Sequence, residues 1–278
     1  MKKKLTAFNN KNLSPISSGV EKIESEYELF PLPANKKSMN DDKLFYLLSK
    51  DIFATQLNDK VIIGITGAEG KTITAYMIKH ILESFGKRCS IIGDDYSFIN
   101  GDYSSNIKSQ VNASYLKKQL SLSKDSYVII EIKPESIEKG YYKLLELDYC
   151  LFTSMKQSVR SDTSLVTAYY SLFDQLRPRG IAIVNTYDQW GRELLKQLKI
   201  QGRKLIYTLG EIDSAAKITD VHIKKNLSVS LYDGAIKYHL NFRYLRGQHN
   251  VINAALAFLI ARSLNLKAEH IVPVLERF

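Results

Sequence analysis

One stretch decides the fold: Val61-Ile62-Ile63-Gly64-Ile65-Thr66-Gly67-Ala68-Glu69-Gly70-Lys71-Thr72. Its first half is continuously apolar, which predicts a strand covered on both faces. From Thr72 to Phe85 apolar residues recur at helical spacing, and Gly86 follows where a helix C-terminus is expected. A strand, a glycine-containing turn and a helix in this order are typical of a phosphate-binding loop. Glycine lets backbone N–H groups turn inward, and the new helix presents its own unpaired N–H groups.

Two side chains complete the predicted loop. Lys71 would reach the outer phosphates of a nucleotide, and the Thr72 hydroxyl would ligate Mg²⁺. The strict pattern G-x-x-x-x-G-K-[ST] is not met, because Ile65 stands at its first glycine, with Gly64 and Gly67 on either side. The alternative is a chance Gly-Lys-Thr at a helix start, which the strand before it and the helix after it disfavour. The stretch therefore predicts an ATP site.

Strands and helices alternate after this stretch, which predicts an α/β fold with a doubly wound, mostly parallel sheet. Further strands are expected at 89–92, 127–132, 149–153, 181–185 and 204–209. Further helices are expected near 163–176, 189–198 and 250–264, with a shorter one ending near Phe278. Asp233-Gly234 lies between two alternating segments, 227–231 and 236–242, which predicts a small antiparallel hairpin.

The first 58 residues differ from the rest. Residues 1–35 are rich in Lys, Asn, Ser and Pro, and residues 41–57 have the apolar spacing of one short helix. We therefore expect residues 1–58 to form an N-terminal arm with a short helix. Residues 59–278 are expected to form the ATP-binding domain.

Composition limits the classes of function. The net charge of +10, from 39 Lys+Arg against 29 Asp+Glu, suits an anionic metabolite, a membrane surface or nucleic acid, but the lysines are scattered, which disfavours nucleic acid. No apolar run approaches the roughly 20 residues of a membrane helix. Cys89 and Cys150 lie in or beside predicted buried strands and suit a reducing, cytoplasmic setting. The histidines lack zinc-ligand spacing.

Residues 63–74 resemble the phosphate loop of the Mur ligase family, ATP-dependent enzymes that join an amino acid to a carboxylate in peptidoglycan precursors. Residues 128–131 resemble the family's strand that ends in a metal-binding glutamate. Residues 183–188 resemble its "N-x-D-D" strand end, with Tyr187 in place of the first aspartate. Residues 246–257 resemble its "G-x-H-N-x-x-N-A-L-A" helix start. The tripeptide-forming members look most similar.

The resemblance implies ATP and Mg²⁺ as cofactors and a UDP-muramoyl peptide precursor as a partner. It implies catalytic roles for Lys71 and Glu131, and metal ligation by Thr72 and Glu131. In the family, asparagines at the helix start that residues 246–257 resemble line the adenine pocket. The implied nucleotide-binding residues are therefore Gly67, Ala68, Glu69, Gly70, Lys71, Thr72, Ile73, Asn250 and Asn253.

The chain also departs from the family at charged positions. Glu69 stands where members carry asparagine, and a carboxylate beside phosphates is repulsive unless it points to solvent. Ser154 replaces an asparagine, and residues 155–163 contain no histidine where members have Asp-His. Phe173 aligns with a helix lysine whose carbamylated form holds a second Mg²⁺. These losses are expected to impair phosphoryl transfer more than ATP binding.

Replacement positive charge and missing domains are the remaining departures. The segment after Glu131 is altered to Lys133-Pro134-Glu135, and Lys133, Lys156 or Arg160 are candidates to replace the lost cation. The chain stops at Phe278, where members continue into a C-terminal ligase domain, so we expect that domain to be absent. Residues 1–58 are then a candidate remnant of the family's N-terminal domain.

Three functions stay open from the sequence. The first is an ATP-dependent ligase of the Mur type, favoured by the loop and the adenine-side asparagines. The second is a non-catalytic nucleotide-binding module that regulates a complete ligase or pairs with a protein that supplies the missing domain. The third, a nucleic-acid-binding protein, rests on charge alone.

Overall fold

The structure, a computed structural model, describes residues 59–93, 95–105, 113–142, 145–155, 163–223 and 226–278. All of them belong to one unit spanning Lys50–Phe278. The predicted arm and its short helix lie outside the described residues, as do Lys156 and Arg160. The domain boundary at 58/59 therefore stays a prediction.

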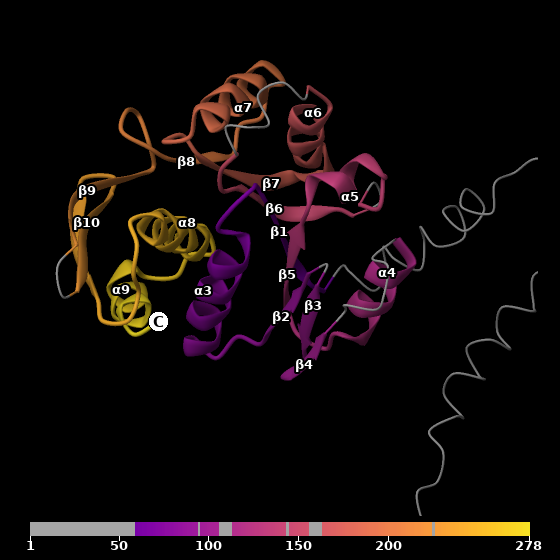
Figure 1. Cartoon of the computed structure of the whole chain (residues 1–278), viewed down its shortest axis with the longest axis horizontal. Coiled ribbons are helices and arrows are strands. Elements are labelled where there is room, and N and C mark those ends of the chain that lie inside the picture. Colours follow the sequence, from indigo (N-terminus) through magenta and orange to yellow (C-terminus); the bar gives the residue numbers. More distant parts are fainter. Residues whose placement is uncertain (1–58, 94, 106–112, 143–144, 156–162, 224–225) are drawn as a thin grey trace, which may run out of the picture. The chain divides into compact units, whose positions relative to one another are not determined.

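A single 11-stranded sheet runs through the described residues, in the order β11-β10-β9-β8-β7-β6-β1-β5-β2-β3-β4 (Figure 1). Its strands are β1 Val61–Thr66, β2 Cys89–Ile92, β3 Tyr96–Ile99, β4 Asp102–Ser105, β5 Tyr127–Ile132, β6 Leu147–Phe152, β7 Leu176–Asn185, β8 Ile206–Leu209, β9 Ala216–Ile223, β10 Leu227–Asp233 and β11 Ile236–Phe242. The helices are α3 Lys71–Ser84, α4 Ala113–Leu122, α5 Pro134–Glu138, α6 Thr163–Ser171, α7 Gln189–Ile200, α8 His249–Ser263 and α9 Ala268–Glu276, with a 3₁₀ helix η2 at Leu172–Gln175.

The centre of the sheet is parallel, as predicted. β1 pairs in parallel with β5 and β6, and the parallel pairing continues from β6 through β7 and β8 to β9, and from β5 to β2. Antiparallel pairs flank this centre: β3 and β4 at one edge, β10 and β11 at the other. The turn at Asp233-Gly234 joins β10 to β11 and confirms the predicted hairpin.

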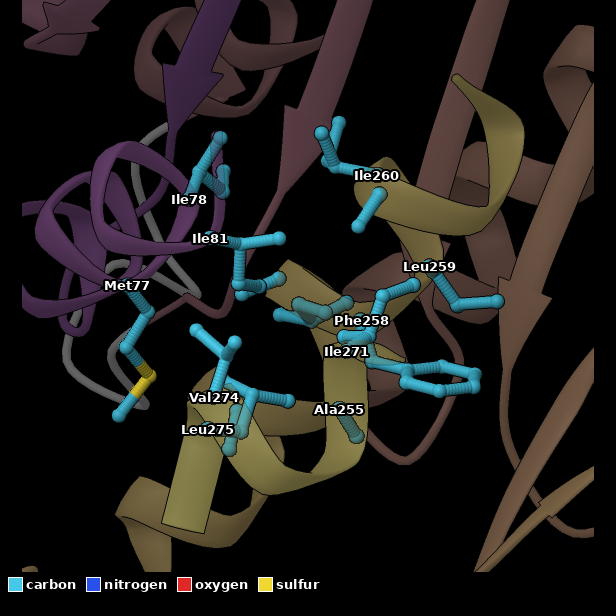
Figure 2. Close-up of a cluster of buried hydrophobic side chains, with 14 of the residues drawn as sticks. Met77, Ile78, Ile81, Ala255, Phe258, Leu259, Ile260, Ile271, Val274 and Leu275 are labelled. Carbon is cyan, nitrogen blue, oxygen red and sulfur yellow. The ribbon is translucent and has the colours of Figure 1, made fainter. Parts of the chain in front are cut away.

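Helices cover both faces of the sheet, which confirms the doubly wound prediction. α3, α8 and α9 pack on one face, where their apolar side chains form one buried cluster (Figure 2). Met77, Ile81, Phe258, Ile271 and Leu275 belong to this cluster and are almost fully buried. The other face packs against α4, α6 and α7 in a second cluster. Within the described residues, no helix is long and apolar enough to cross a membrane.

Several short elements were not predicted. β3, β4, β9, α4 and α5 are absent from the sequence-based expectation, because each is short or mostly polar and none has a strong period. β4 is exposed along its whole length, so it has no buried face to produce an alternating pattern. Tertiary pairing with β3 holds it in the sheet.

The topology brings together the three loops that follow β1, β5 and β6. β1 lies between β5 and β6, and Thr66 at its carboxyl end is level with Ile132 and Phe152. The chain leaves β1 toward β2 on one side and later crosses from β5 to β6 on the other. Such a switch point is where open α/β sheets bind ligands, at the carboxyl ends of the strands.

Candidate phosphate and metal site

The loop between β1 and α3 has room for glycine alone at two positions. Gly67 has φ 136° and Gly70 has φ 84°, both in the region that side chains other than glycine rarely adopt. A Cβ at Gly67 would overlap the Thr153 hydroxyl, and a Cβ at Gly70 would overlap the Asn253 amide oxygen. The two glycines therefore set the shape of the loop.

The two residues that follow β6, Thr153 and Ser154, hold this loop in place. Ala68 N donates to Ser154 O at 2.7 Å, and Thr153 Oγ1 donates to Glu69 O at 2.6 Å. Asn185, at the end of β7, in turn donates from Nδ2 to Thr153 O at 2.7 Å. The loop is thus fixed by backbone and side-chain bonds before any ligand binds, which reduces the entropy lost on binding.

The predicted lysine lies over its own loop. Lys71 Nζ donates to Gly67 O at 2.7 Å, so the ammonium group lies against the phosphate loop. The N-cap residue of α3 is Gly70, which makes no side-chain cap, and the positive N-terminal end of the helix suits an anion. Glu69 is exposed to solvent, which removes much of the expected repulsion. The structure brings the predicted residues 67–73 together at the start of α3.

The two predicted metal ligands touch each other. Glu131 is the next-to-last residue of β5, which pairs with β1, and it is only 7% exposed. Its Oε2 accepts a hydrogen bond from Thr72 Oγ1 at 2.6 Å. Two ligand oxygens at neighbouring corners of a Mg²⁺ octahedron lie about 3 Å apart. The pair therefore needs only a small adjustment to hold Mg²⁺.

The ligand set also suits a cation that binds together with a nucleotide. In the described part of the chain, no three His, Cys, Asp or Glu side chains converge as a metal site. Mg²⁺ is commonly held by one or two carboxylates plus substrate phosphates and waters. Thr72 and Glu131 fit that arrangement, with the phosphate loop beside them.

A tyrosine that the sequence did not nominate completes the site. Tyr96, on β3, donates from its hydroxyl to Glu131 Oε1, the second oxygen of the same carboxylate. Its ring stacks with the rings of Tyr76 and Tyr103, whose centroids lie 6.0 and 6.1 Å from its own. Burial, reinforced by the negative charge of Glu131, raises the pKa of Tyr96 well above its usual range. Tyr96 is therefore a neutral donor; without a prediction of β3, the sequence offered no signal for it.

The two predicted adenine-side residues lie at the start of α8. Asn250 Nδ2 donates to Arg246 O at 2.6 Å, and Asn253 Nδ2 donates to Asn250 Oδ1 at 3.1 Å. The oxygen of Asn253 lies against Gly70, and the residue is 5% exposed. The structure thus places Asn253 as a contact between α8 and the phosphate loop. Contact of either residue with adenine stays a prediction.

Two residues of the altered "N-x-D-D" segment have structural partners. The Tyr187 hydroxyl accepts from Ile218 N at 2.9 Å and donates to Ile218 O at 3.1 Å, which ties the end of β7 to β9. Asp188 caps α7 by accepting from Trp190 N and Gly191 N, and it also accepts from Met155 N at 3.2 Å. Tyr187 stands where the resembled pattern has an aspartate, and its hydroxyl links the end of β7 to β9.

The structure corrects the expectation for Phe173. We expected it on the helix that follows β6, at the place of a metal-binding lysine. That helix, α6, ends at Ser171, and Phe173 lies in η2, 1% exposed, just before β7 begins. β7 runs in the same direction as β6 and β1. Phe173 therefore lies at the amino ends of these strands, whereas the phosphate loop lies at their carboxyl ends. Phe173 is a core residue of the second cluster.

Lys133, a candidate replacement cation, has a carboxylate partner. Its Nζ lies 3.1 Å from Asp95 Oδ2, and both side chains are largely exposed. An exposed pair of this kind contributes little to stability. The pair lies near the carboxyl end of β5, one residue from Tyr96 along the chain and two from Glu131.

Comparison with known proteins agrees with this geometry. Residues 65–261 match the Mur ligase middle domain. The chain belongs to this family. Among curated relatives of this Mur-family chain, the UDP-N-acetylmuramoyl-L-alanyl-D-glutamate–2,6-diaminopimelate ligase of Clostridium perfringens is 23% identical over 237 residues, which cover 82% of this chain and 48% of the relative.

Solved structures share the fold at lower sequence identity. A structure of a UDP-N-acetylmuramoyl-L-alanyl-D-glutamate–2,6-diaminopimelate ligase aligns with a TM-score of 0.74 and 17% identity over 88% of this chain and 52% of that one. The MurF ligase of Thermotoga maritima, solved in complex with ADP, aligns with a TM-score of 0.60 and 12% identity, over 87% and 56% of the two chains. The Mur-family chain spans about half the length of the curated relatives it matches.

Proposed function

We propose that this Mur-family chain binds ATP with Mg²⁺ at the loop 67–73 and serves as the nucleotide-binding part of an ATP-dependent ligase. The ligase would join an amino acid to the carboxylate of a UDP-muramoyl peptide precursor. The observation that carries the proposal is the contact between Thr72 and Glu131 directly beside a loop that only glycine can form. The contact supports a cation site that lies beside an anion site.

Each part of the site has a stated task in this proposal. The backbone N–H groups of the loop and of the start of α3 hold the phosphates. The Lys71 ammonium, which donates to Gly67 O in the structure, moves to contact the outer phosphates. Thr72 and Glu131 hold Mg²⁺, which supplies charge neutralisation during phosphoryl transfer. Asn253 keeps the loop in place from α8.

The relatives support the ligase chemistry. The Clostridium perfringens relative and the first of the two solved structures are named as UDP-N-acetylmuramoyl-L-alanyl-D-glutamate–2,6-diaminopimelate ligases, and the Thermotoga maritima MurF ligase structure contains ADP. Because the chain covers about half of such relatives, the acceptor and the amino acid belong to the proposal rather than to the family assignment.

A second candidate is a nucleotide-binding module without turnover. The observation that favours it concerns the second metal. No lysine occurs between Lys156 and Lys196, so α6 carries none, and Phe173 lies in the core. Without a second cation, phosphoryl transfer would be slower while ATP still binds. Such a module would act by regulating a complete ligase or by pairing with a protein that supplies the ligase domain.

The first experiment measures thermal stability with and without ATP and Mg²⁺. We expect saturating ATP to raise the melting temperature by about 5 °C or more, because a ligand at 100 times its Kd stabilises the folded state by about 2.7 kcal/mol. Lys71→Ala should abolish most of the rise. Lys118→Ala, which removes an exposed lysine on α4, is the matched control and should leave it intact. A wild-type chain that shows no rise at millimolar ATP would contradict the proposal.

Phosphate release separates the two candidates. The chain is incubated with ATP, Mg²⁺, UDP-muramoyl peptides and amino acids. Release that requires both the acceptor and the amino acid supports the ligase. Binding of ATP without release supports the non-catalytic module.

A further inference from the structure

Both oxygens of the Glu131 carboxylate have protein partners. Thr72 Oγ1 donates to Oε2 at 2.6 Å, and the Tyr96 hydroxyl donates to Oε1. The two donors come from different elements, α3 and β3, and meet the carboxylate at the end of β5. Each oxygen of the carboxylate therefore accepts from a hydroxyl.

The tyrosine is fixed in this position by its surroundings. Its ring stacks with the rings of Tyr76 and Tyr103, with interplanar angles of 10° and 19°. Tyr96 O also accepts from Gly93 N at 2.8 Å, and β3 is paired with β2 on one side and β4 on the other. Because the backbone and the ring are both held, the hydroxyl has little freedom to leave Oε1.

This arrangement bears on the choice of cation. Ca²⁺ accepts six to eight oxygens and often takes both oxygens of one carboxylate, whereas Mg²⁺ requires an octahedron at shorter distances and is commonly bound through one carboxylate oxygen. A cation that binds Thr72 Oγ1 would take over the Thr72 contact with Oε2, whereas the Tyr96 hydroxyl stays on Oε1 and favours ligation through Oε2 alone. Single-oxygen ligation of this kind suits Mg²⁺ and disfavours Ca²⁺.

We propose that Tyr96 is a positioning residue that makes Glu131 a one-oxygen ligand and thereby selects Mg²⁺ over Ca²⁺ at the nucleotide site. The inference rests on the proposed binding of ATP. It adds a specificity role for a side chain on β3, outside the phosphate loop. Tyr76 and Tyr103 act through Tyr96 by holding its ring.

The test compares cations by calorimetric titration of ATP into the chain. Affinity is measured with Mg²⁺, with Ca²⁺ and with EDTA, for wild type, Tyr96→Phe and Tyr103→Phe. Wild type should bind ATP more tightly with Mg²⁺ than with Ca²⁺. Tyr96→Phe keeps the stacked ring and removes the donor, so the Mg²⁺/Ca²⁺ affinity ratio should fall by about 10-fold, the usual scale for loss of a partner of a metal ligand. The affinity in EDTA should not change.

Tyr103→Phe is the matched control. It also removes one tyrosine hydroxyl while keeping a stacked ring, but Tyr103 is 63% exposed. Its Mg²⁺/Ca²⁺ ratio should equal that of wild type. Circular dichroism melts of both variants show that each is folded before titration.

The outcomes separate the inference from the proposed function. Wild-type binding of ATP with an unchanged ratio in Tyr96→Phe overturns the inference and leaves ATP binding intact. A wild type that binds equally well with Mg²⁺ and Ca²⁺ overturns it too, without need of any variant. Absence of ATP binding in all three conditions refutes the proposed function, and the role of Tyr96 falls with it.

Discussion

Gly70 lies at the point where α8 touches the phosphate loop. Its φ of 84° is unfavourable for any residue with a Cβ, and an added Cβ would overlap the Asn253 amide. Gly86, just after α3, has a similar φ of 71° but no atom within 4 Å of an added Cβ. Substitution at Gly86 therefore tests backbone strain alone, whereas substitution at Gly70 tests strain together with steric overlap.

We expect Gly70→Ala to lower the free energy of unfolding by about 3 kcal/mol and Gly86→Ala by about 1 kcal/mol. Urea unfolding of the two variants measures both values. Gly70→Ala should also weaken ATP binding, whereas Gly86→Ala should not. Equal losses of stability in the two variants would show that the contact with Asn253 has no energetic effect.

Single residues differ in how far the sequence can identify them. Lys71 and Thr72 lie within one short motif, so their neighbours in sequence are their neighbours in space. Tyr96 contacts Glu131 across 35 positions of the chain. That contact depends on the pairing of β3 with β2 and of β2 with β5, which no local pattern specifies.

At the scale of elements, Tyr187 connects two parts of the sheet. Its hydroxyl serves both backbone groups of Ile218, so the loop after β7 is tied to β9, where the parallel centre meets the antiparallel edge. Half-buried backbone groups that lose a partner destabilise a fold because they are partly removed from water.

Tyr187→Phe removes this link while keeping the ring. We expect a loss of about 1–2 kcal/mol in the free energy of unfolding, since both an acceptor and a donor are removed. Tyr244→Phe, at a tyrosine that is 69% exposed, is the control and should change stability by less than about 0.5 kcal/mol. Denaturant titration gives both numbers, and a neutral Tyr187→Phe would mean that water replaces the hydroxyl.

The same link explains an element that the sequence did not predict. β9 has an irregular burial pattern and a register shift opposite Ser228 and Ser230, so its side chains do not alternate cleanly. Pairing with β10 and the bond to Tyr187 hold it in place. Strands of this kind are specified by partners distant in sequence rather than by their own periodicity.

At the scale of the whole molecule, the two cysteines report on the integrity of the sheet. Cys150 on β6 is fully buried, Cys89 on β2 is nearly so, and both are reduced. Burial raises the pKa of both thiols above the ordinary value. The thiolate is the reactive form, so the native chain should react with thiol reagents only when the sheet opens.

The raised pKa also predicts how stability depends on pH. The unfolded thiols ionise near pH 8.5, whereas the folded thiols keep their protons to higher pH. Below about pH 8.5 the thiols are protonated in both states, and the free energy of unfolding does not depend on them. Above about pH 8.5 the unfolded chain loses thiol protons that the folded chain keeps, so the free energy of unfolding decreases. Urea unfolding at about pH 7 and about pH 9.5 should show lower stability at the higher pH. A Cys89→Ala/Cys150→Ala variant should show a smaller decrease; an equal decrease would assign the effect to other groups.

Some features of the protein follow from the sequence by itself. The strand, glycine turn and helix at residues 61–84, the parallel α/β class and the hairpin at Asp233-Gly234 are local patterns, because their period and turn chemistry involve neighbouring residues. The family resemblance also followed from short motifs, and the match over residues 65–261 confirms it.

Other features were decided by the tertiary structure. The position of Asn253 against Gly70, the burial of Phe173 at the far end of the sheet, and the hydroxyl of Tyr96 on Glu131 all join residues that are distant in sequence or separated by strand crossings. The physical reason is that strand order and register determine which side chains meet at the edge of a sheet. Many registers suit the same apolar pattern until the helices pack.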